Sequence, residues 1–259
     1  MEHSQQHIAS NEAAWDRAAQ TYAEDIERDV AMLRAGQASL MPDELRLLGD
    51  LFEVEQAIHL QCSHGLDALS LLQLGVQRVV GIDISQAMLA QAQQKTEALG
   101  ANAQWVHSAV LSIPDAWNAS ADLIYTGKGA LPWMHDIVAW AQVVARLLKP
   151  SGRLFVYEGH PLTWVWNPEQ PRHRLREGRG YFDAQPKANA DFPAAAVERY
   201  TPEGETPPAA WEWPWTLGQV VTAVAQAGLH IEHLEEHPVH LGLQGLCTVY
   251  VAFFRRFFG

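Results

Sequence analysis

Residues 57–67, AIHLQCSHGLD, together with residues 78–83, RVVGID, decide the fold of this chain. Each stretch is an apolar run of strand length that ends in small or polar residues. Between the two predicted strands, at 57–61 and 78–83, Leu66, Leu69 and Leu72 recur at the spacing of one helix face. A strand, a helix and a second strand in this order are typical of a parallel βαβ unit. We therefore expect a ligand crevice beyond the carboxyl ends of these strands.

The same alternation continues along the chain. Further strands are predicted at 103–107, 121–126, 152–158, 229–235 and 246–254, and further helices at 85–100, 137–148 and 216–228. This order predicts an α/β fold with a doubly wound, seven-stranded, mostly parallel sheet and an antiparallel last strand. The predicted core comprises residues 51–159 and 216–259.

Two segments lie outside this core. Residues 1–50 are interpreted as a helical lid, with one amphipathic helix over 11–34 that places Trp15 and Tyr22 on the same side. Residues 160–215 are rich in Pro, Trp, Arg and Gly and show no sustained period, so they are predicted to form an inserted cap over the sheet.

Composition excludes several kinds of partner. The formal net charge is -12 and no run of Lys or Arg occurs, which argues against binding to a nucleic acid backbone. The N-terminal residues MEHSQQHIASNEAAW show no basic stretch followed by an apolar one, and the rest shows no uncharged apolar run near 18 residues, so we expect neither export nor a membrane span. The two cysteines, Cys62 and Cys247, lie far apart in apolar surroundings, as expected of reduced thiols. We expect a cytoplasmic protein whose partner is a small molecule, with an oligomeric state that the sequence does not determine.

The loop after the first strand indicates which ligand to expect. A phosphate-binding loop would need three glycines or a Gly-Lys-Ser/Thr ending, and this loop keeps only Gly65. Asp83 ends the second strand about 20 residues further on, where a carboxylate can accept from both hydroxyls of a ribose. The pattern favours a nucleoside over NAD or ATP.

Three motifs carry a resemblance to a known family: HLQCSHGLD at 59–67, TGKGAL at 126–131 and EGHP at 158–161. With them, the chain resembles class I S-adenosylmethionine-dependent methyltransferases, in a small-molecule branch that has this form of first loop. The family usually has an acidic residue and three alternating glycines there. Those positions are His59, Gln61, Ser63 and Gly65 in this chain, so three of the four differ.

The resemblance implies a Rossmann-like methyltransferase fold and S-adenosylmethionine as cofactor. It places the first loop against the methionine part, Asp83 on the ribose, and Ile84 and Met88 beside the adenine. Ala109 stands where an aspartate commonly accepts from the adenine amino group, so that hydrogen bond is expected to be missing. The residues expected to bind the cofactor are Tyr22, His59, Gln61, Cys62, Gly65, Asp83, Ile84, Met88, Ser108, Ala109, Val110, Thr126 and Gly127.

Methyl transfer needs alignment and a water-poor pocket, and an acceptor that carries a proton also needs a base. Glu158 and His160 lie just beyond the fifth strand and are the predicted catalytic residues, the alternative being a capping carboxylate and a turn residue. Aromatic rings suit a planar or cationic acceptor, so Trp15, Trp133 and Trp164 are predicted to bind it. The alternative is that these rings pack the cap onto the sheet.

No metal site is predicted. His230, His233, His237 and His240 alternate with glutamates, but on a strand His230 and His233 face opposite sides, so the imidazoles would not converge.

The sequence thus predicts methyl transfer to an O, N or C nucleophile of a small molecule. The main alternative is a noncatalytic ligand-binding or interaction protein that keeps the fold, which would be indifferent to the loss of Asp83. A nicotinamide-dependent oxidoreductase is disfavoured by the first loop.

Overall fold

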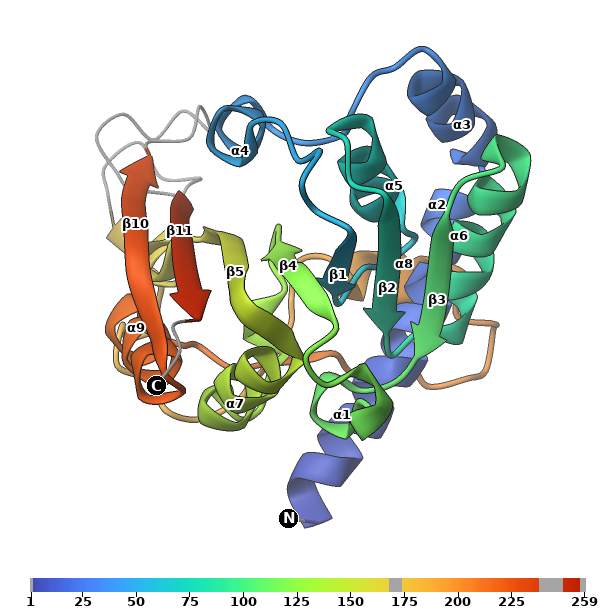
Figure 1. Cartoon of the computed structure of the whole chain (residues 1–259). Helices are drawn as coiled ribbons and strands as arrows, with labels where there is room; N and C mark the ends of the chain where they lie inside the picture. Colours follow the sequence, from blue (N-terminus) through green and yellow to red (C-terminus); the bar gives the residue numbers. More distant parts are fainter. Residues whose placement is uncertain (1, 168–173, 238–248, 257–259) are drawn as a thin grey trace.

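A mixed β-sheet forms the centre of the protein. The structure is a computed structural model that describes residues 2–167, 174–237 and 249–256. Within them, seven strands form the sheet in the order β10-β11-β5-β4-β1-β2-β3 (Figure 1). Their bounds are β1 Gln56–Leu60, β2 Arg78–Asp83, β3 Ala103–His107, β4 Ala121–Gly127, β5 Leu148–Gly159, β10 Leu229–His237 and β11 Val249–Arg256. Strand β11 is antiparallel to both β5 and β10, whereas β1 to β5 pair in parallel. The predicted fold class is confirmed.

Helices cover both faces of this sheet. One face packs Ile58, Ile82 and Ile124 against α7 and α9, and the other packs Ala57 and Val79 against α5. The two faces bury alternate residues of the same strands, as expected of a doubly wound sheet. The helix bounds are α5 Leu66–Gln73, α6 Gln86–Leu99, α7 Ile137–Leu147 and α9 Leu217–Gln226, and short 3₁₀ helices occur at Val110–Ser112, Asp115–Trp117, Leu131–Trp133 and Pro161–Trp164.

The winding of the chain reverses beside β1. Ile58 of β1 pairs with Val80 of β2 on one side and with Ile124 of β4 on the other. The chain therefore proceeds outward through β2 and β3 and then returns to continue through β4 and β5. The carboxyl ends of β1 and β4 diverge at this point, which is where open α/β sheets bind ligands.

The N-terminal segment is more broken than predicted. Instead of one helix over 11–34, the structure has α1 Glu2–Ala18, α2 Gln20–Ala23 and α3 Ile26–Arg34, followed by α4 Pro42–Leu48. The Ala19 carbonyl accepts from the Gln91 side chain of α6 at 2.6 Å, so a tertiary contact holds the chain where α1 ends. Asp16 of α1 also accepts from the Ser85 hydroxyl at 2.6 Å. These bonds fix α1 and the α1–α2 turn against the start of α6.

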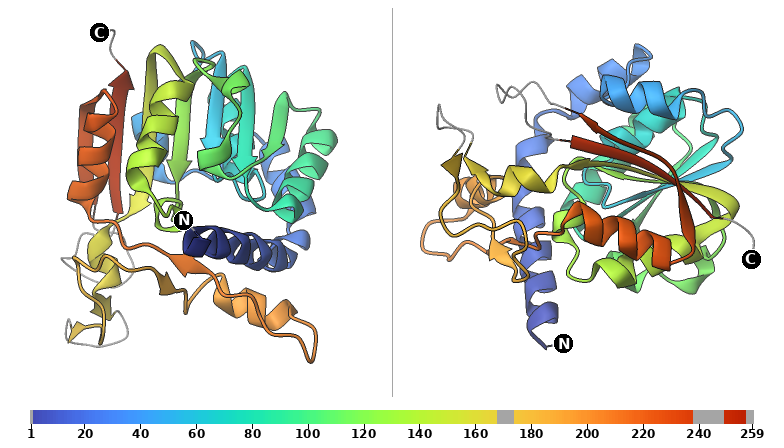
Figure 2. Two further views of the ribbon diagram at one scale, coloured as in Figure 1. Left: turned by 90° about the horizontal axis from the view of Figure 1, so that it is seen from below. Right: turned by 90° about the vertical axis from the view of Figure 1, so that its left-hand side faces the viewer.

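Residues 160–215 contain short elements: β6 Trp166–Asn167, β7 Arg174–Leu175, β8 Lys187–Ala188, α8 Ala194–Tyr200 and β9 Trp211–Glu212. The left view of Figure 2 shows α1 between the sheet and the orange segment that carries α8 and β9. The Asn11 side chain accepts from the Trp211 amide at 2.6 Å and donates to its carbonyl at 2.9 Å. The segment is therefore attached to α1, and the division into lid, core and cap stays a prediction.

No helix within the described residues has the length and apolarity needed to cross a membrane. Cys62 is a buried free thiol, while Cys247 and the predicted strand residues 246–248 lie outside the described residues.

Candidate functional site

A cavity of about 450 Å³ opens where β1, β2 and β4 end. It is lined by the loops that follow these strands, by α1 and by the segment beyond β4. The predicted site residues that line it are Trp15, Tyr22, His59, Gln61, Cys62, Asp83, Ile84, Met88, Ser108, Ala109, Val110, Gly127 and Trp133. The remaining predicted residues, which do not line it, are Gly65, Thr126, Glu158, His160 and Trp164. The structure thus brings most of the predicted site together from six separate segments.

The first loop takes a shape that usually requires glycine. Gln61 and Ser63 have φ angles of 57° and 50°, in the left-handed region that costs a residue with a Cβ roughly 1–2 kcal/mol. Hydrogen bonds hold this conformation: the Cys62 amide donates to Ile82 at 3.1 Å and the Ser63 amide to the Asp83 carboxylate at 2.7 Å. The Gln61 side chain donates to the Ala130 carbonyl at 2.7 Å, which joins the loops after β1 and β4.

Gly65 serves packing rather than contact with the cavity. Its φ is 78°, and a Cβ there would lie 2.6 Å from both Ala92 Cβ and the Trp105 ring. Gly127 has a similar role after β4, because a Cβ there would lie 2.9 Å from the Tyr157 carbonyl oxygen. Both glycines let neighbouring segments approach closely.

Asp83 is the carboxylate at the centre of the site. Its two oxygens accept from the Ser63 amide at 2.7 Å and the Ser85 amide at 2.8 Å, and the residue is 8% exposed. Burial raises the pKa of Asp83 to about 6, and the backbone donors only partly oppose this effect. A carboxylate has about four acceptor positions, so Asp83 can still accept from a ligand.

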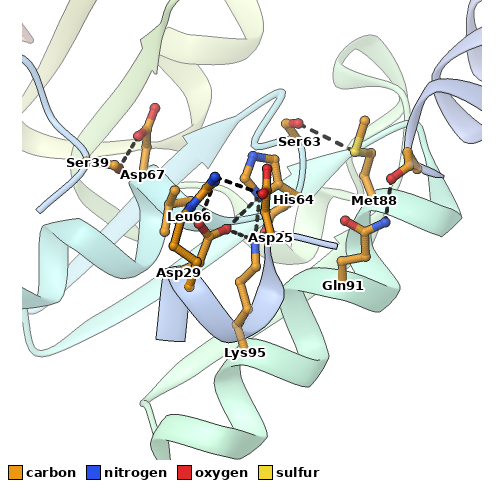
Figure 3. Close-up of polar contacts among 12 residues, drawn as sticks. Asp25, Asp29, Ser39, Ser63, His64, Leu66, Asp67, Met88, Gln91 and Lys95 are labelled. Atoms are coloured by element: carbon orange, nitrogen blue, oxygen red, sulfur yellow. Dashed lines mark hydrogen bonds and ion pairs between the residues drawn. The ribbon is translucent and has the colours of Figure 1, made fainter. Parts of the chain in front are cut away.

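A buried ionic network links the first loop to α3 and α6. Figure 3 shows Lys95, His64 and Asp29 converging. Lys95 Nζ lies 2.9 Å from Asp29 Oδ2 and donates to the His64 carbonyl at 3.1 Å and also to His64 Nδ1. An ammonium can only donate, so the proton of the neutral imidazole is assigned to Nε2. Burial and the nearby Lys95 ammonium lower the pKa of His64 to about 4, and Tyr22 stacks on its ring at 4.2 Å.

Two polar atoms in the cavity wall have no hydrogen-bond partner among the residues that the structure describes. They are His59 Nδ1 and Gln61 Oε1, both buried among the described residues. Burial lowers the pKa of His59 to about 4, so this imidazole is neutral near pH 7. An unsatisfied buried polar atom costs about 1–3 kcal/mol, which a polar ligand in the cavity can recover.

The charged groups of the wall are already engaged. Lys128 Nζ lies 2.8 Å from Asp67 Oδ1 and 3.6 Å from Glu44 Oε2, and it donates to the Ser39 carbonyl at 3.0 Å. Asp67 also accepts from the Ser39 hydroxyl.

Aromatic rings form a further part of the cavity wall. Trp15 meets Trp133 edge to face at 5.2 Å between ring centroids and Phe192 at 5.8 Å. Phe192 in turn meets Tyr22 at 6.1 Å. Because each ring touches the next, the four make a continuous apolar surface, here called the aromatic wall.

Glu158 and His160 have contacts that keep them out of the cavity. Glu158 is 3% exposed and accepts from the Leu131 amide at 2.9 Å and the Gly159 amide at 2.8 Å, and burial raises its pKa. His160 accepts from the Leu162 amide at 3.1 Å and lies 2.8 Å from Glu236. Their catalytic role stays a prediction, and this geometry favours the alternative, in which Glu158 fixes the turn after β4.

Trp164 and Thr126 also lie away from the cavity. Arg179 stacks over the Trp164 ring at 5.3 Å, so this tryptophan packs within residues 160–215. Thr126 is fully buried in β4.

Several cavity residues were not predicted. His64, Lys128 and His135 lie in loops that follow β1 and β4, so their position beyond strand ends was the available signal. Phe192 lies in the aperiodic segment, where no local pattern indicates which residue reaches the site. No group of three or more His, Cys, Asp or Glu that could hold a metal ion occurs among the described residues, and His240 lies outside them.

Comparisons with known proteins agree with this geometry. Residues 57–152 match a family described as a methyltransferase domain. An S-adenosylmethionine-dependent methyltransferase from Mesorhizobium loti is 19% identical, with a TM-score of 0.62, covering 83% of this chain and 96% of that one. One from Methanosarcina mazei is 17% identical, with a TM-score of 0.59, covering 85% and 99%. No curated protein matches the sequence. At these identities, the two structures show a shared fold.

Proposed function

We propose that the protein is an S-adenosylmethionine-dependent enzyme that methylates a small molecule held between the first loop and the aromatic wall, since residues 57–152 match a family described as a methyltransferase domain. The observation that carries this proposal is the placement of Asp83, the first loop and the aromatic wall around one cavity at the switch point of the sheet.

The cavity fits S-adenosylmethionine. The two ribose hydroxyls can donate to the remaining acceptor positions of Asp83. The methionine ammonium would meet the unpartnered Gln61 Oε1 and His59 Nδ1, and Ile84 and Met88 offer apolar surface to the adenine. Bound there, the cofactor supplies an electrophilic methyl group on a sulfonium.

The protein contributes alignment and exclusion of water. Asp16 and Asn11 anchor α1 to the start of α6 and to β9, so Trp15 is held over the cavity from both sides. Two side chains fix the turn after β4: Glu158 accepts from the Leu131 amide, and Gln61 donates to the Ala130 carbonyl. Preorganised walls of this kind lower the cost of bringing two reactants into line.

A transfer assay tests the proposal. The protein is incubated with methyl-tritiated S-adenosylmethionine and a protein-free cell extract, and label is followed in the small-molecule fraction. We expect labelled product and an equal amount of S-adenosylhomocysteine. Asp83→Ala should weaken cofactor binding by about 1–3 kcal/mol through lost hydrogen bonds, whereas Asp115→Ala, with its side chain 90% exposed, should not. Label found in macromolecules alone would contradict the proposal.

Cofactor affinity should also depend on pH through Asp83. Its pKa of about 6 means that the free protein holds a proton there below pH 6, and the ribose hydroxyls favour the ionised form. The Kd for S-adenosylhomocysteine should therefore rise as the pH falls from 7 to 5, by up to about tenfold per unit below pH 6. Calorimetric titration at several pH values measures this, and Asp83→Asn should remove the dependence. Equal affinity at pH 5 and pH 7 would show that Asp83 does not bind the ribose.

A further inference from the structure

His135 is one of the residues that line the cavity, and it directly follows Trp133 and Met134 in the chain. It belongs to the turn between β4 and α7. Among the described residues, neither of its ring nitrogens has a hydrogen-bond partner, and its protein contact is an edge-to-face approach to Trp213 at 6.1 Å. Its imidazole is thus available to a molecule in the cavity.

The backbone on both sides of His135 is held in place. The Trp213 amide donates to the Pro132 carbonyl at 2.7 Å, and the Trp215 indole donates to the Met134 carbonyl at 2.7 Å. The next residue, Asp136, accepts from the Val138 and Ala139 amides and so starts α7. A side chain on a backbone fixed in this way can hold a reacting group in one position.

The electrostatic surroundings keep His135 neutral near pH 7. Partial burial lowers its pKa, and the carboxylate of Asp136 opposes this only in part. An unprotonated imidazole nitrogen is a proton acceptor suited to general base catalysis.

The lining of the cavity also limits the charge of the acceptor. The carboxylates that line the cavity are Asp83, which backbone amides occupy, and Asp67, which pairs with Lys128. A cationic acceptor would therefore lack a free anionic partner among the described lining residues. The rings of the aromatic wall meet at steep angles of 85°, 63° and 83° between their planes, so a flat aromatic acceptor can stack on one ring and meet the next edge to face.

We propose that His135 is a catalytic residue, which takes the proton from the hydroxyl of a neutral, flat, aromatic acceptor stacked on the aromatic wall. This inference rests on the proposed methyl transfer. In the step, a lone pair of the hydroxyl oxygen forms the bond to the methyl carbon, and the carbon–sulfur bond breaks with its electron pair going to sulfur. The hydroxyl proton moves to the free ring nitrogen of His135, which then releases it to solvent.

Two phenols of different acidity test the role of His135. With 4-methylphenol, which stays protonated at pH 8, His135→Gln should lower the turnover by about 100-fold or more. 4-Nitrophenol is ionised at pH 8, so its methylation needs no base. With this acceptor, the turnover of the same variant should fall by less than about fivefold. His233→Gln, a histidine of β10 outside the cavity, is the matched control and should keep full turnover with both.

The outcomes separate the inference from the proposed function. An equal loss with both phenols would assign His135 to structure, and full activity of the variant would remove it from the reaction. Tyramine carries an ammonium group on the same kind of ring. Faster methyl transfer to tyramine than to 4-methylphenol would overturn the inference that the acceptor is neutral. No transfer to any of these phenols, with S-adenosylhomocysteine still bound in calorimetry, overturns this inference alone. Absence of S-adenosylhomocysteine binding overturns the proposed function.

Discussion

Replacing Lys95 by methionine is expected to lower the free energy of unfolding by about 3 kcal/mol. Lys95 is fully buried, and its ammonium lies 2.9 Å from Asp29, which is 1% exposed. Without Lys95, the buried Asp29 carboxylate would keep the largely exposed Arg28 at 3.3 Å, and His64 at 3.7 Å would be an ionic partner only when protonated. A buried charge that loses its main partner costs more than the pair itself contributed.

Urea denaturation measures this effect, and a double variant isolates its cause. Lys95→Met combined with Asp29→Leu should recover most of the lost stability, because an apolar pair of similar volume replaces the ion pair. Lys149→Met is the matched control: its ammonium also meets two carboxylates, Glu55 and Asp122, but is 30% exposed, so the loss should stay below about 1 kcal/mol. A double variant less stable than Lys95→Met would show that the charge of Asp29 is not the cause.

Gly81→Ala is the second change with a large expected effect, again about 3 kcal/mol of lost stability. Gly81 lies within β2, and a Cβ there would lie 2.2 Å from the Trp105 ring and 2.8 Å from Cys62 Sγ. The same ring leaves only 2.6 Å for a Cβ at Gly65. The Trp105 indole therefore fills the space that both glycines leave open, and it donates to the Thr96 hydroxyl at 2.9 Å.

Denaturation followed by tryptophan fluorescence tests this packing. Because Cys62 lines the cavity, Gly81→Ala should also weaken binding of S-adenosylhomocysteine. Gly81→Ala with Trp105→Leu should regain part of the stability, since the smaller side chain leaves room for the methyl group. Gly218→Ala, where no atom lies within 4 Å of the added Cβ, should be neutral or slightly stabilising. Equal stability of Gly81→Ala and wild type would contradict the packing of Trp105.

The fold was predictable because its signals are local. Strands β1, β2 and β4 contain short apolar runs, and several helices have a recognisable start, such as Ser85 before α6 and Thr216 before α9. The antiparallel last strand followed from a connection too short for a crossover. The break in the N-terminal helix was not predicted. At this break, the Ala19 carbonyl accepts a hydrogen bond from Gln91, a residue distant in sequence.

Site residues that directly follow a strand were predictable from the sequence. Contacts between segments far apart in the chain were not. Asp83 and the first loop follow directly from β2 and β1, and Gln61 and Ser63 adopt left-handed angles although neither is glycine. The Lys95–His64–Asp29 contacts join three segments, and no local pattern relates them. Phe192 reaches the cavity through a segment without periodicity. Motif order thus predicted the cavity residues at the strand ends better than those of the aromatic wall.

The central claim is that this cavity binds S-adenosylmethionine through Asp83 and the first loop. Calorimetric titration of the full chain with S-adenosylhomocysteine at pH 7.5 tests it most directly. The structure predicts saturable binding at one site per chain, weakened by about 1–3 kcal/mol in Asp83→Ala. No heat of binding at millimolar S-adenosylhomocysteine, from protein that unfolds cooperatively, would contradict the claim.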